Sequence, residues 1–313
     1  MIYFINDPHI ADRPPLGRVE GYADQILAKL EECRELARAD SASLTVFTGD
    51  VFHIKRPSFV SHALMQRMID LLREWPGRKF TVLGNHDLSE AGLASVPKQP
   101  IGVLLRAGVL ELLPEDGIVV EVSGCKVYLE AAHYSDTDDP EYFALHNRPK
   151  CDVAIKVTHG MLVPPGRDPP FDHIKAEDIP AGADYLFNGH IHDDYGAREI
   201  NGCTHVNFGS LGRVARTDEN RKREVAIAVY DPVKNVVTRR ALKSALPSAD
   251  IFITVEAENV EDSDDLKAYA RELAHALQQG TGASIEDLLA GASDGVAKDV
   301  KVEVTRYLTE AGL

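Results

Sequence analysis

The sequence predicts an α/β fold with a mostly parallel central sheet, a second sheet stacked on it and a small C-terminal α+β region. Two patterns predict it. Short apolar, β-branched runs alternate with segments of helical periodicity in the first part of the chain, and paired strands joined by turn residues follow. The composition, with 44% hydrophobic and 27% charged residues, is that of a chain that packs a core.

The first part of the chain alternates strands with helices. Short apolar runs predict three strands, at 2–5, 44–47 and 80–83. Apolar residues at helical spacing predict a helix at about 20–39 and another after Pro57-Ser58, with Ser58 as its cap. A β-α-β-α-β order favours parallel pairing, because each crossover helix returns the chain to the same end of the sheet.

The middle of the chain contains further strands, which we expect to form the second sheet. Alternating apolar residues and the turn Asn201-Gly202 are typical of hairpins. The expected elements are a helix near 101–106, a hairpin of 118–122 and 126–131, a helical segment at 139–147, strands at 153–157 and 185–187, a hairpin of 197–200 and 204–208, and a strand pair at 224–230 and 236–242.

The composition shifts near residue 247, which divides the chain into a main domain, 1–246, and a small C-terminal region, 247–313. In the second region we expect a strand at 251–255 and a helix capped by Asp262-Ser263. The tail at 294–313 fits both strand and helix periodicity, and we favour helix.

Charge and cysteine content disfavour several classes of protein. The formal net charge of −15 argues against a protein that grips nucleic acid unaided, although bound cations or a partner can supply positive charge. The four cysteines include no Cys-x-x-Cys pair, which disfavours zinc-finger and disulfide frameworks. The N-terminus reads as a strand rather than a signal peptide, and no apolar run has membrane-spanning length. We therefore expect a soluble, cytoplasmic protein without membrane contact.

Polar clusters follow five of the apolar runs. Any one of them is more simply explained as a strand cap or a surface histidine, but five together predict one metal centre, because ligands collect at the carboxyl ends of strands in open α/β sheets. The clusters are Asp7-Pro8-His9, Gly49-Asp50-Val51-Phe52-His53, Gly84-Asn85-His86-Asp87, Thr158-His159-Gly160 and Gly189-His190-Ile191-His192.

Carboxylate, imidazole and amide ligands without thiolates suit Mn²⁺, Fe or Zn²⁺. Two ions roughly 3.5–4 Å apart need a negatively charged bridge, and Asp50 is the natural bridge because its strand is central among the five. The other expected ligands are Asp7, His9 and His192 for one ion, and Asn85, His159 and His190 for the other.

A water held between two such ions loses a proton near neutral pH and becomes a nucleophile, while the ions hold a phosphate for in-line attack. His86 stands beside the ligand Asn85 without needing to be one. It is placed to give a proton to the leaving oxygen or to stabilise charge in the transition state.

In this order, Asp-x-His, Gly-Asp, Gly-Asn-His-Asp, His-Gly and Gly-His-x-His resemble the calcineurin-like metallophosphoesterase superfamily, over Asp7 to His192. The resemblance implies a four-layer α-β-β-α sandwich, a di-metal centre and phosphoester hydrolysis. It also implies the ligand set given above and a catalytic role for His86.

One position selects a branch of the superfamily. Protein phosphatases carry Asp three residues after the bridging Asp, whereas this chain has His53 there, followed by Arg56-Pro57-Ser58. This is similar to the Mre11/SbcD family of DNA repair nucleases and their phage exonuclease-subunit relatives. It implies a Mn²⁺-dependent DNA exo- or endonuclease in which His53 orients the scissile phosphate or assists the leaving group. The segment Phe208-Gly209-Ser210-Leu211 is a weaker similarity to the same family.

The resemblance also implies DNA as a partner, a coiled-coil ATPase of the Rad50/SbcC type and a homodimer, with the C-terminal region as a cap or partner-binding unit. Arg13, Lys55 and Arg56, together with Arg18 and Arg213, could line a phosphate track, but they fit solvated surface charge equally well. Two alternatives stay open. One is a phosphomonoesterase or cyclic-nucleotide phosphodiesterase, and the other is a non-enzymatic subunit that keeps the fold for DNA tethering.

Overall fold

The computed structural model describes residues 1–15, 17–53, 60–89, 91–169 and 172–253. The predicted elements beyond residue 253 therefore lie outside the described residues, as does Ser58, and the domain division at 246/247 stays a prediction. The helices and strands in chain order are β1 (Ile2–Ile5), α1 (Tyr22–Ala39), β2 (Leu44–Phe47), α2 (His62–Arg73), β3 (Arg78–Thr81), η2 (Leu93–Lys98), α3 (Pro100–Arg106), β4 (Glu111–Leu112), β5 (Ile118–Val122), β6 (Cys125–Ala132), η3 (Pro140–Phe143), β7 (Val153–His159), β8 (Leu162–Val163), β9 (Ile174–Lys175), η4 (Ala176–Asp178), β10 (Tyr185–Gly189), β11 (Asp194–Ile200), β12 (Cys203–Phe208), α4 (Asp218–Lys222), β13 (Ala226–Asp231), β14 (Val236–Ala241) and α5 (Ser248–Ile251).

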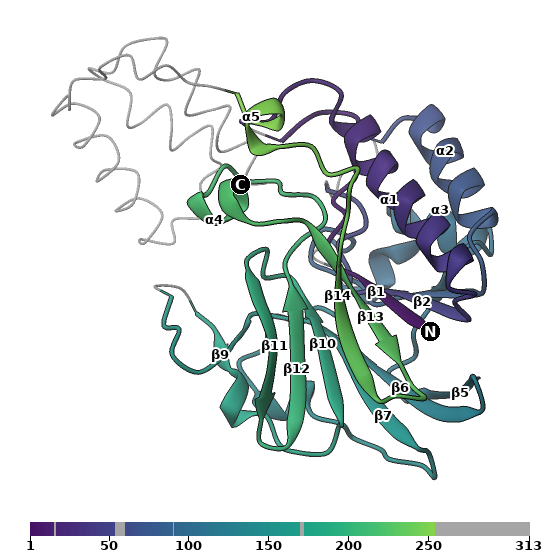
Figure 1. Cartoon of the computed structure of the whole chain (residues 1–313), viewed down its shortest axis with the longest axis vertical. Coiled ribbons are helices and arrows are strands. Elements are labelled where there is room, and N and C mark those ends of the chain that lie inside the picture. The colour runs from purple at the N-terminus through teal and green to yellow at the C-terminus, as the bar shows by residue number, and fades with distance from the viewer. Residues whose placement is uncertain (16, 54–59, 90, 170–171, 254–313) are drawn as a thin grey trace, which may run out of the picture. The chain divides into compact units, whose positions relative to one another are not determined.

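The first sheet has six strands in the order β14-β13-β1-β2-β3-β4 (Figure 1). The strands β1 to β4 pair in parallel, as the β-α-β-α-β pattern predicts. Side chains of β1 alternate between two cores: Ile2 and Phe4 face the second sheet, and Tyr3 and Ile5 face the helices. This alternation places β1 inside the fold, buried on both faces.

The strand pair expected at 224–230 and 236–242 does not join the second sheet, and this prediction was wrong. β13 pairs antiparallel with β1, with Tyr3 opposite Val229, and β14 extends the same sheet. The reason is long-range packing. Tyr230 enters the core between the sheets and Val229 enters the core beneath the helices, so β13 covers an edge of β1 that would otherwise be unpaired.

The second sheet has six strands in the order β11-β12-β10-β7-β6-β5. Its strand β10 brings the ring of Phe187 onto the ring of Phe4, with centroids 3.5 Å apart and planes inclined by 3°. This stack lies in a shared apolar core that joins the two sheets face to face.

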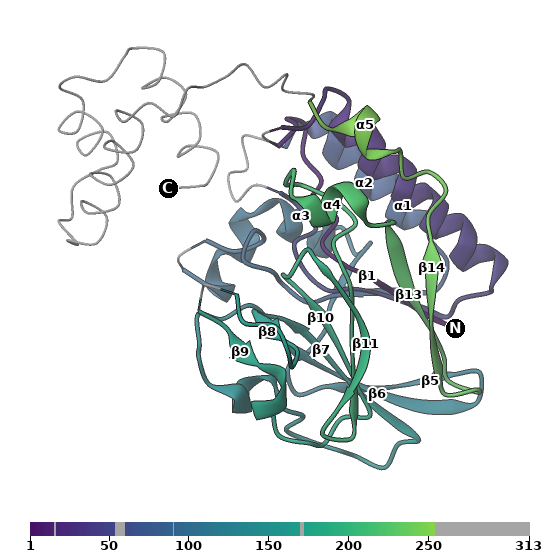
Figure 2. The same cartoon turned by 60° about the vertical axis from the view of Figure 1, so that its left-hand side comes forward.

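Helices and turns cover the outer faces of the two sheets (Figure 2). α1, α2 and α3 pack on the first sheet, and the second sheet is covered by η3, η4 and the two-stranded sheet β8-β9. The predicted sandwich of two sheets between outer layers is confirmed. The helix expected at 139–147 is wrong: only Pro140–Phe143 form a 3₁₀ turn, because the N–H groups of His146 and Asn147 donate to the Glu130 carboxylate instead of to helical carbonyls.

Three boundaries differ from the predictions in ways that affect the site. β3 ends at Thr81, so residues 82 and 83 already run toward the polar cluster that follows. α2 begins at His62, where the hydroxyl of Ser61 accepts the Leu64 N–H at 3.1 Å. Ile251 ends the short helix α5 rather than starting a strand. No helix within the described ranges has the length and apolar character needed to cross a membrane.

Candidate metal centre

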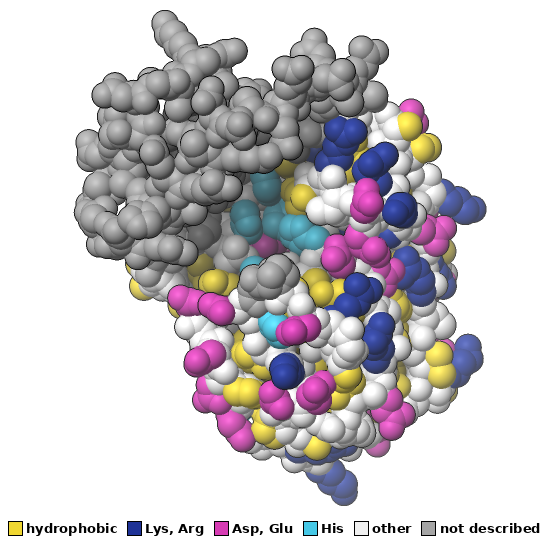
Figure 3. All heavy atoms as spheres, turned by 90° about the vertical axis from the view of Figure 1, so that its left-hand side faces the viewer, with side chains coloured by type: hydrophobic (Ala, Val, Ile, Leu, Met, Phe, Trp, Pro, Cys, Tyr) yellow, Lys and Arg dark blue, Asp and Glu magenta, His cyan; other side chains and the backbone are white. Residues whose placement is uncertain are grey.

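The five predicted clusters converge at one edge, where strands of both sheets end. Figure 3 shows histidine side chains gathered in a recess on this face. The backbone turns sharply here, because Asp7, His9, Asp50 and His190 have positive φ values of 43°, 50°, 47° and 74°. Such conformations are uncommon for residues other than glycine and concentrate at functional sites.

A first group of ligand atoms surrounds the Oδ2 atom of Asp50. His9 places Nε2 3.5 Å from this oxygen and 2.8 Å from Nε2 of His192, and the three residues form a group able to hold a metal ion. Asp7 is fully buried beside them. Its Oδ1 accepts the His190 N–H at 2.9 Å, whereas its Oδ2 is buried without a hydrogen-bond partner among the described residues.

A second group lies on the other side of the same Asp50 oxygen. Nε2 of His159 is 3.3 Å from Asp50 Oδ2, and Asp50, His159 and His190 form a second group able to hold a metal. The amide oxygen of Asn85 completes it, at 3.3 Å from His159 Nε2 and 3.0 Å from His190 Nδ1. Nδ1 of His159 donates to the Thr48 carbonyl at 2.7 Å, which leaves Nε2 as the atom available to a cation.

The residues present fit two divalent cations. Two imidazole nitrogens 2.8 Å apart and an orphaned carboxylate oxygen all lie in a buried space. A buried charged oxygen without a partner is costly, and a cation removes that cost. Asp50 belongs to both groups, which is the arrangement predicted for a bridging ligand.

The electrostatics keep His9, Asp50, His190 and His192 in the forms that bind cations. Burial lowers the pKa of His190 and His192 to about 3 and holds that of His9 well below its usual value, so these imidazoles are neutral. Burial would raise the pKa of Asp50, but the neighbouring histidines, His159 above all, hold it well below its usual value.

The pKa values of Asp7 and His159 shift in the opposite direction to those of the other ligands of the same type. Burial raises the pKa of Asp7 to about 7, with the Asp50 charge adding to the effect. Burial would lower the pKa of His159, but Asp50 and Asp7 outweigh it and raise the pKa to about 9. In the protein without metal, His159 therefore carries the positive charge that balances these carboxylates.

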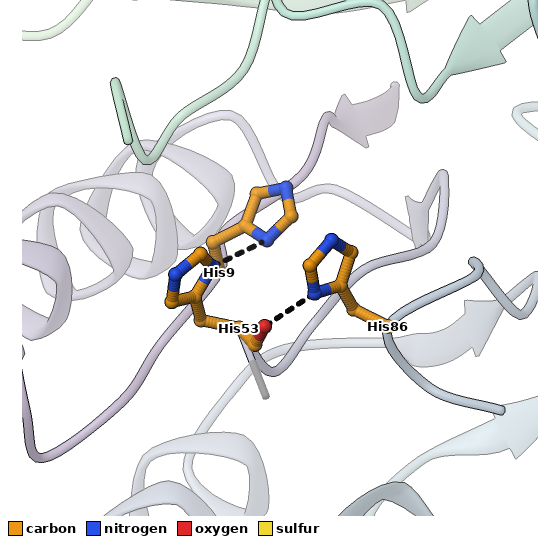
Figure 4. Close-up of side chains that lie close together, drawn as sticks. All are labelled: His9, His53 and His86. Carbon is orange, nitrogen blue, oxygen red and sulfur yellow. Dashed lines mark hydrogen bonds between the residues drawn. The ribbon is translucent and has the colours of Figure 1, made fainter. Parts of the chain in front are cut away.

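His53 and His86 lie beside His9, at the edge of the first group (Figure 4). Nδ1 of His53 is 3.3 Å from Nδ1 of His9, and the rings of His53 and His86 stack with centroids 5.4 Å apart. Nδ1 of His86 donates to the His53 carbonyl, so its Nε2 is not engaged by that carbonyl. These three imidazoles form a third group of potential ligands, which shares His9 with the first.

Several residues that hold the site together were not predicted from the sequence. Asp87 is buried and accepts the Gly84 N–H at 3.0 Å, closing the turn that carries Asn85 and His86. The segment 207–212 hydrogen-bonds to the loop that carries Asp7, and we call this segment the strap. The N–H groups of Leu211 and Gly212 donate to the carbonyls of Asn6 and Asp7 at 2.7 and 3.1 Å. The sequence similarity at 208–211 pointed to this segment but not to its contacts.

Of the five basic residues expected along a phosphate track, the structure describes Arg13, Arg18 and Arg213. Arg13 is exposed, and Lys55 and Arg56 lie outside the described residues. Arg18 and Arg213 are buried, and Arg18 donates to the carbonyls of Gly212 and Arg213 at 2.7 and 2.8 Å. The place proposed for these two on the track was wrong, because backbone carbonyls near the strap already bind guanidinium groups there.

Solved structures that are distantly similar to this chain include the three that follow, whereas no curated protein matches it. A novel archaeal phosphodiesterase is 14% identical and covers 77% of this chain and 99% of its own, with a TM-score of 0.39. The Thermus thermophilus protein TT1561 is 11% identical and covers 77% and 97%, with a TM-score of 0.45. The Thermus thermophilus sulfate thiohydrolase SoxB is 13% identical and covers 78% and 56%, with a TM-score of 0.46.

A sequence model of the calcineurin-like phosphoesterases matches residues 1–194, more than half of the chain and every residue of the two metal groups. Members of this family hydrolyse phosphoesters with two divalent metal ions, and the two groups that share Asp50 have the matching arrangement. The chain therefore belongs to the calcineurin-like phosphoesterase family of metal-dependent hydrolases.

Proposed function

We propose that this protein is a phosphodiesterase that cleaves DNA, as a Mn²⁺-dependent exo- or endonuclease of the Mre11/SbcD branch. One observation carries the proposal: His53, the residue at the branch-selecting position, lies against both His9 and His86. A protein phosphatase would have an Asp at this position. An imidazole beside His86 instead offers a second ring to the ester oxygen that leaves.

The residues of the chain have distinct roles in this proposal. The two ions, when bound by the two groups around Asp50, would supply an activated water and neutralise the phosphate. Nδ1 of His86 is engaged by the His53 carbonyl, so Nε2 is the atom that can give a proton to the leaving oxygen. His53 would orient the scissile phosphate from the same side.

The charge of the site suits a diester. The nine predicted ligand and catalytic residues hydrogen-bond to one another and to backbone groups within the described part of the chain, and no lysine or arginine side chain bonds to them there. A diester carries one negative charge, whereas a monoester carries up to two near neutral pH.

One observation favours the second candidate, a phosphomonoesterase or cyclic-nucleotide phosphodiesterase. The net charge of −15 repels a long polyanion, and a small substrate meets little of that repulsion. In the nuclease proposal, a Rad50/SbcC-like ATPase would supply the grip on DNA, and the protein would act in the cytoplasm as a homodimer within that complex.

The test compares substrates under one set of conditions. Wild-type protein with Mn²⁺, alone and with its ATPase, is incubated with linear duplex DNA, hairpin DNA, p-nitrophenyl phosphate and its bis-ester. We expect DNA and the bis-ester to be cleaved. Rapid hydrolysis of the monoester with DNA left intact would establish the second candidate instead.

Two variants test the branch. His53→Ala should keep its metals and lose DNA cleavage, and His62→Ala, which removes an exposed histidine from the first turn of α2, should cleave DNA at the wild-type rate. Unchanged DNA cleavage by His53→Ala would contradict the assignment to this branch.

A further inference from the structure

Tyr134 lies just beyond the end of β6, a sixth strand exit at the same edge as the five ligand clusters. The dipeptide His133-Tyr134 pairs with both polar groups of the Leu83 backbone. The Leu83 N–H donates to Nδ1 of His133 at 3.1 Å, and the Tyr134 N–H donates to the Leu83 carbonyl at 2.8 Å. Because Leu83 immediately precedes Gly84-Asn85, the backbone of Tyr134 is fixed to the loop that carries a predicted ligand.

The ring of Tyr134 lies against the second metal group. Its centroid is 5.6 Å from that of His190 and 6.2 Å from that of His159. His53 and His86, in contrast, have their ring contacts with His9 of the first group. Tyr134 therefore flanks the site at the end away from the two predicted catalytic histidines.

The hydroxyl of Tyr134 has no hydrogen-bond partner among the residues that the structure describes, although the side chain is only partly exposed. The hydroxyl is not among the buried polar atoms without a partner in the described residues, so it is open to solvent and to a substrate. The hydroxyl is therefore available as a donor beside the second metal group.

We propose that Tyr134 is a substrate-binding residue whose hydroxyl donates a hydrogen bond to a phosphoryl oxygen of the ester bound across the two metal groups. The inference rests on the phosphoester hydrolysis part of the proposed function, and it holds for DNA and small diesters alike because the phosphoryl group is common to both. The competing explanation is that the ring only packs against His190 and keeps this imidazole in place.

The test uses full-length protein loaded with Mn²⁺ and the substitution Tyr134→Phe, which keeps the ring and removes the hydroxyl. Loss of a hydrogen bond to a charged oxygen should lower kcat/KM for bis-p-nitrophenyl phosphate by about 10–100-fold. The dissociation constant for inorganic phosphate, measured by calorimetry, should rise by a similar factor, while the bound Mn²⁺ stays at the wild-type amount.

Tyr142→Phe is the matched control. The Tyr142 hydroxyl donates to the His133 carbonyl at 2.8 Å, so its removal disturbs the neighbouring backbone without removing a group from the site. We expect this variant to keep wild-type kcat/KM and phosphate affinity. Equal losses in both variants would show an indirect structural effect and overturn the proposal.

Two other results would also overturn it. Unchanged phosphate affinity in Tyr134→Phe would show that the ring only packs against His190, and a loss of bound Mn²⁺ would show that the hydroxyl supports the metal site rather than the substrate. Failure of the nuclease proposal can be distinguished from failure of the Tyr134 proposal. If the wild type cleaves the bis-ester but not DNA, the Tyr134 test proceeds on the bis-ester. If the wild type cleaves neither, the phosphate affinities still decide it.

Discussion

One oxygen of the Asp50 carboxylate accepts the backbone N–H of His86 at 2.8 Å, while its other oxygen lies 3.5 Å from His9 and 3.3 Å from His159. The same side chain thus faces both metal groups and holds the loop that carries the proposed proton donor. A single substitution at Asp50 should therefore affect metal binding and catalysis together, whereas substitutions around it should separate the two.

Asp50→Ala should lower the affinity for both ions, because it removes the carboxylate that the two groups share. His192→Ala should weaken only one site, since His192 belongs to the first group alone. The number of Mn²⁺ ions per chain, measured by elemental analysis after gel filtration, checks both. Loss of one ion from Asp50→Ala with normal affinity for the second would exclude a bridging role.

His86→Ala should retain both ions and lower kcat by about 10²–10⁴-fold, as loss of a general acid does. The structure keeps the imidazole beside the first group without making it part of the Asp50 groups. Turnover of the bis-ester and metal content measured on the same preparation test this. A fall in bound metal that matched the fall in kcat would show that His86 is a ligand instead.

Gly84→Ala should abolish metal binding. A Cβ atom at this position would collide with the carboxylate of Asp50 and would lie 2.5 Å from the Asp50 backbone nitrogen. Gly182→Ala is the control, because a Cβ atom there meets nothing closer than Leu145 at 3.4 Å among the described residues. Circular dichroism shows whether each variant folds, and calorimetry gives its Mn²⁺ affinity. Wild-type Mn²⁺ affinity in Gly84→Ala would show that the turn can accommodate a Cβ atom, contrary to the contacts in the structure.

A buried ion pair away from the site provides a test of the fold. Glu130 and Lys156 are both fully buried, and Nζ of Lys156 donates to Oε1 of Glu130 at 2.7 Å. Glu130→Gln should lower the free energy of unfolding by about 3–5 kcal/mol at neutral pH, because it leaves a buried ammonium without its counter-ion. The double variant Glu130→Gln with Lys156→Met should recover much of this loss in urea unfolding.

The pH dependence of this loss has a definite sign. Burial would raise the pKa of Glu130, but the His146 N–H and Lys156 hold it below its ordinary value of 4.5. The carboxylate is thus more acidic in the folded state, so its stabilisation is present above about pH 4.5 and is lost as the pH falls through the folded-state pKa. The difference between wild type and Glu130→Gln should therefore shrink on acidification. A difference that stayed constant below pH 4.5 would contradict this account.

The parts that could be predicted from the sequence are those set by local order. His190 and His192 alternate in one short loop, and the structure directs them to different groups, as their spacing suggested. The parts that could not be predicted depend on long-range contacts. The pairing of β13 with β1 joins residues more than two hundred positions apart, and no local pattern encodes it. The burial of Arg18 follows from carbonyls at 212 and 213, which its own neighbours in sequence do not reveal.

His133-Tyr134 is an omission of a different kind. The dipeptide follows an apolar strand just as the five ligand clusters do, so the same criterion could have found it. The contacts with Leu83 that fix it to the Asn85 loop become visible only when the two sheets are placed together.

The insertion of β13 beside β1 also dictates the order of events when the chain is made. The first ligand loop leaves the ribosome early, but β1 acquires its second neighbour only when Ala228 to Tyr230 have been synthesised, and the strap at Leu211–Gly212 also arrives late. A nascent chain that stalled near residue 194, where the family match ends, would carry every predicted ligand. It would lack β13 and the strap, which hold the ligand loops in place. Cations should therefore be captured only after β13 has been made, as a late and cooperative step.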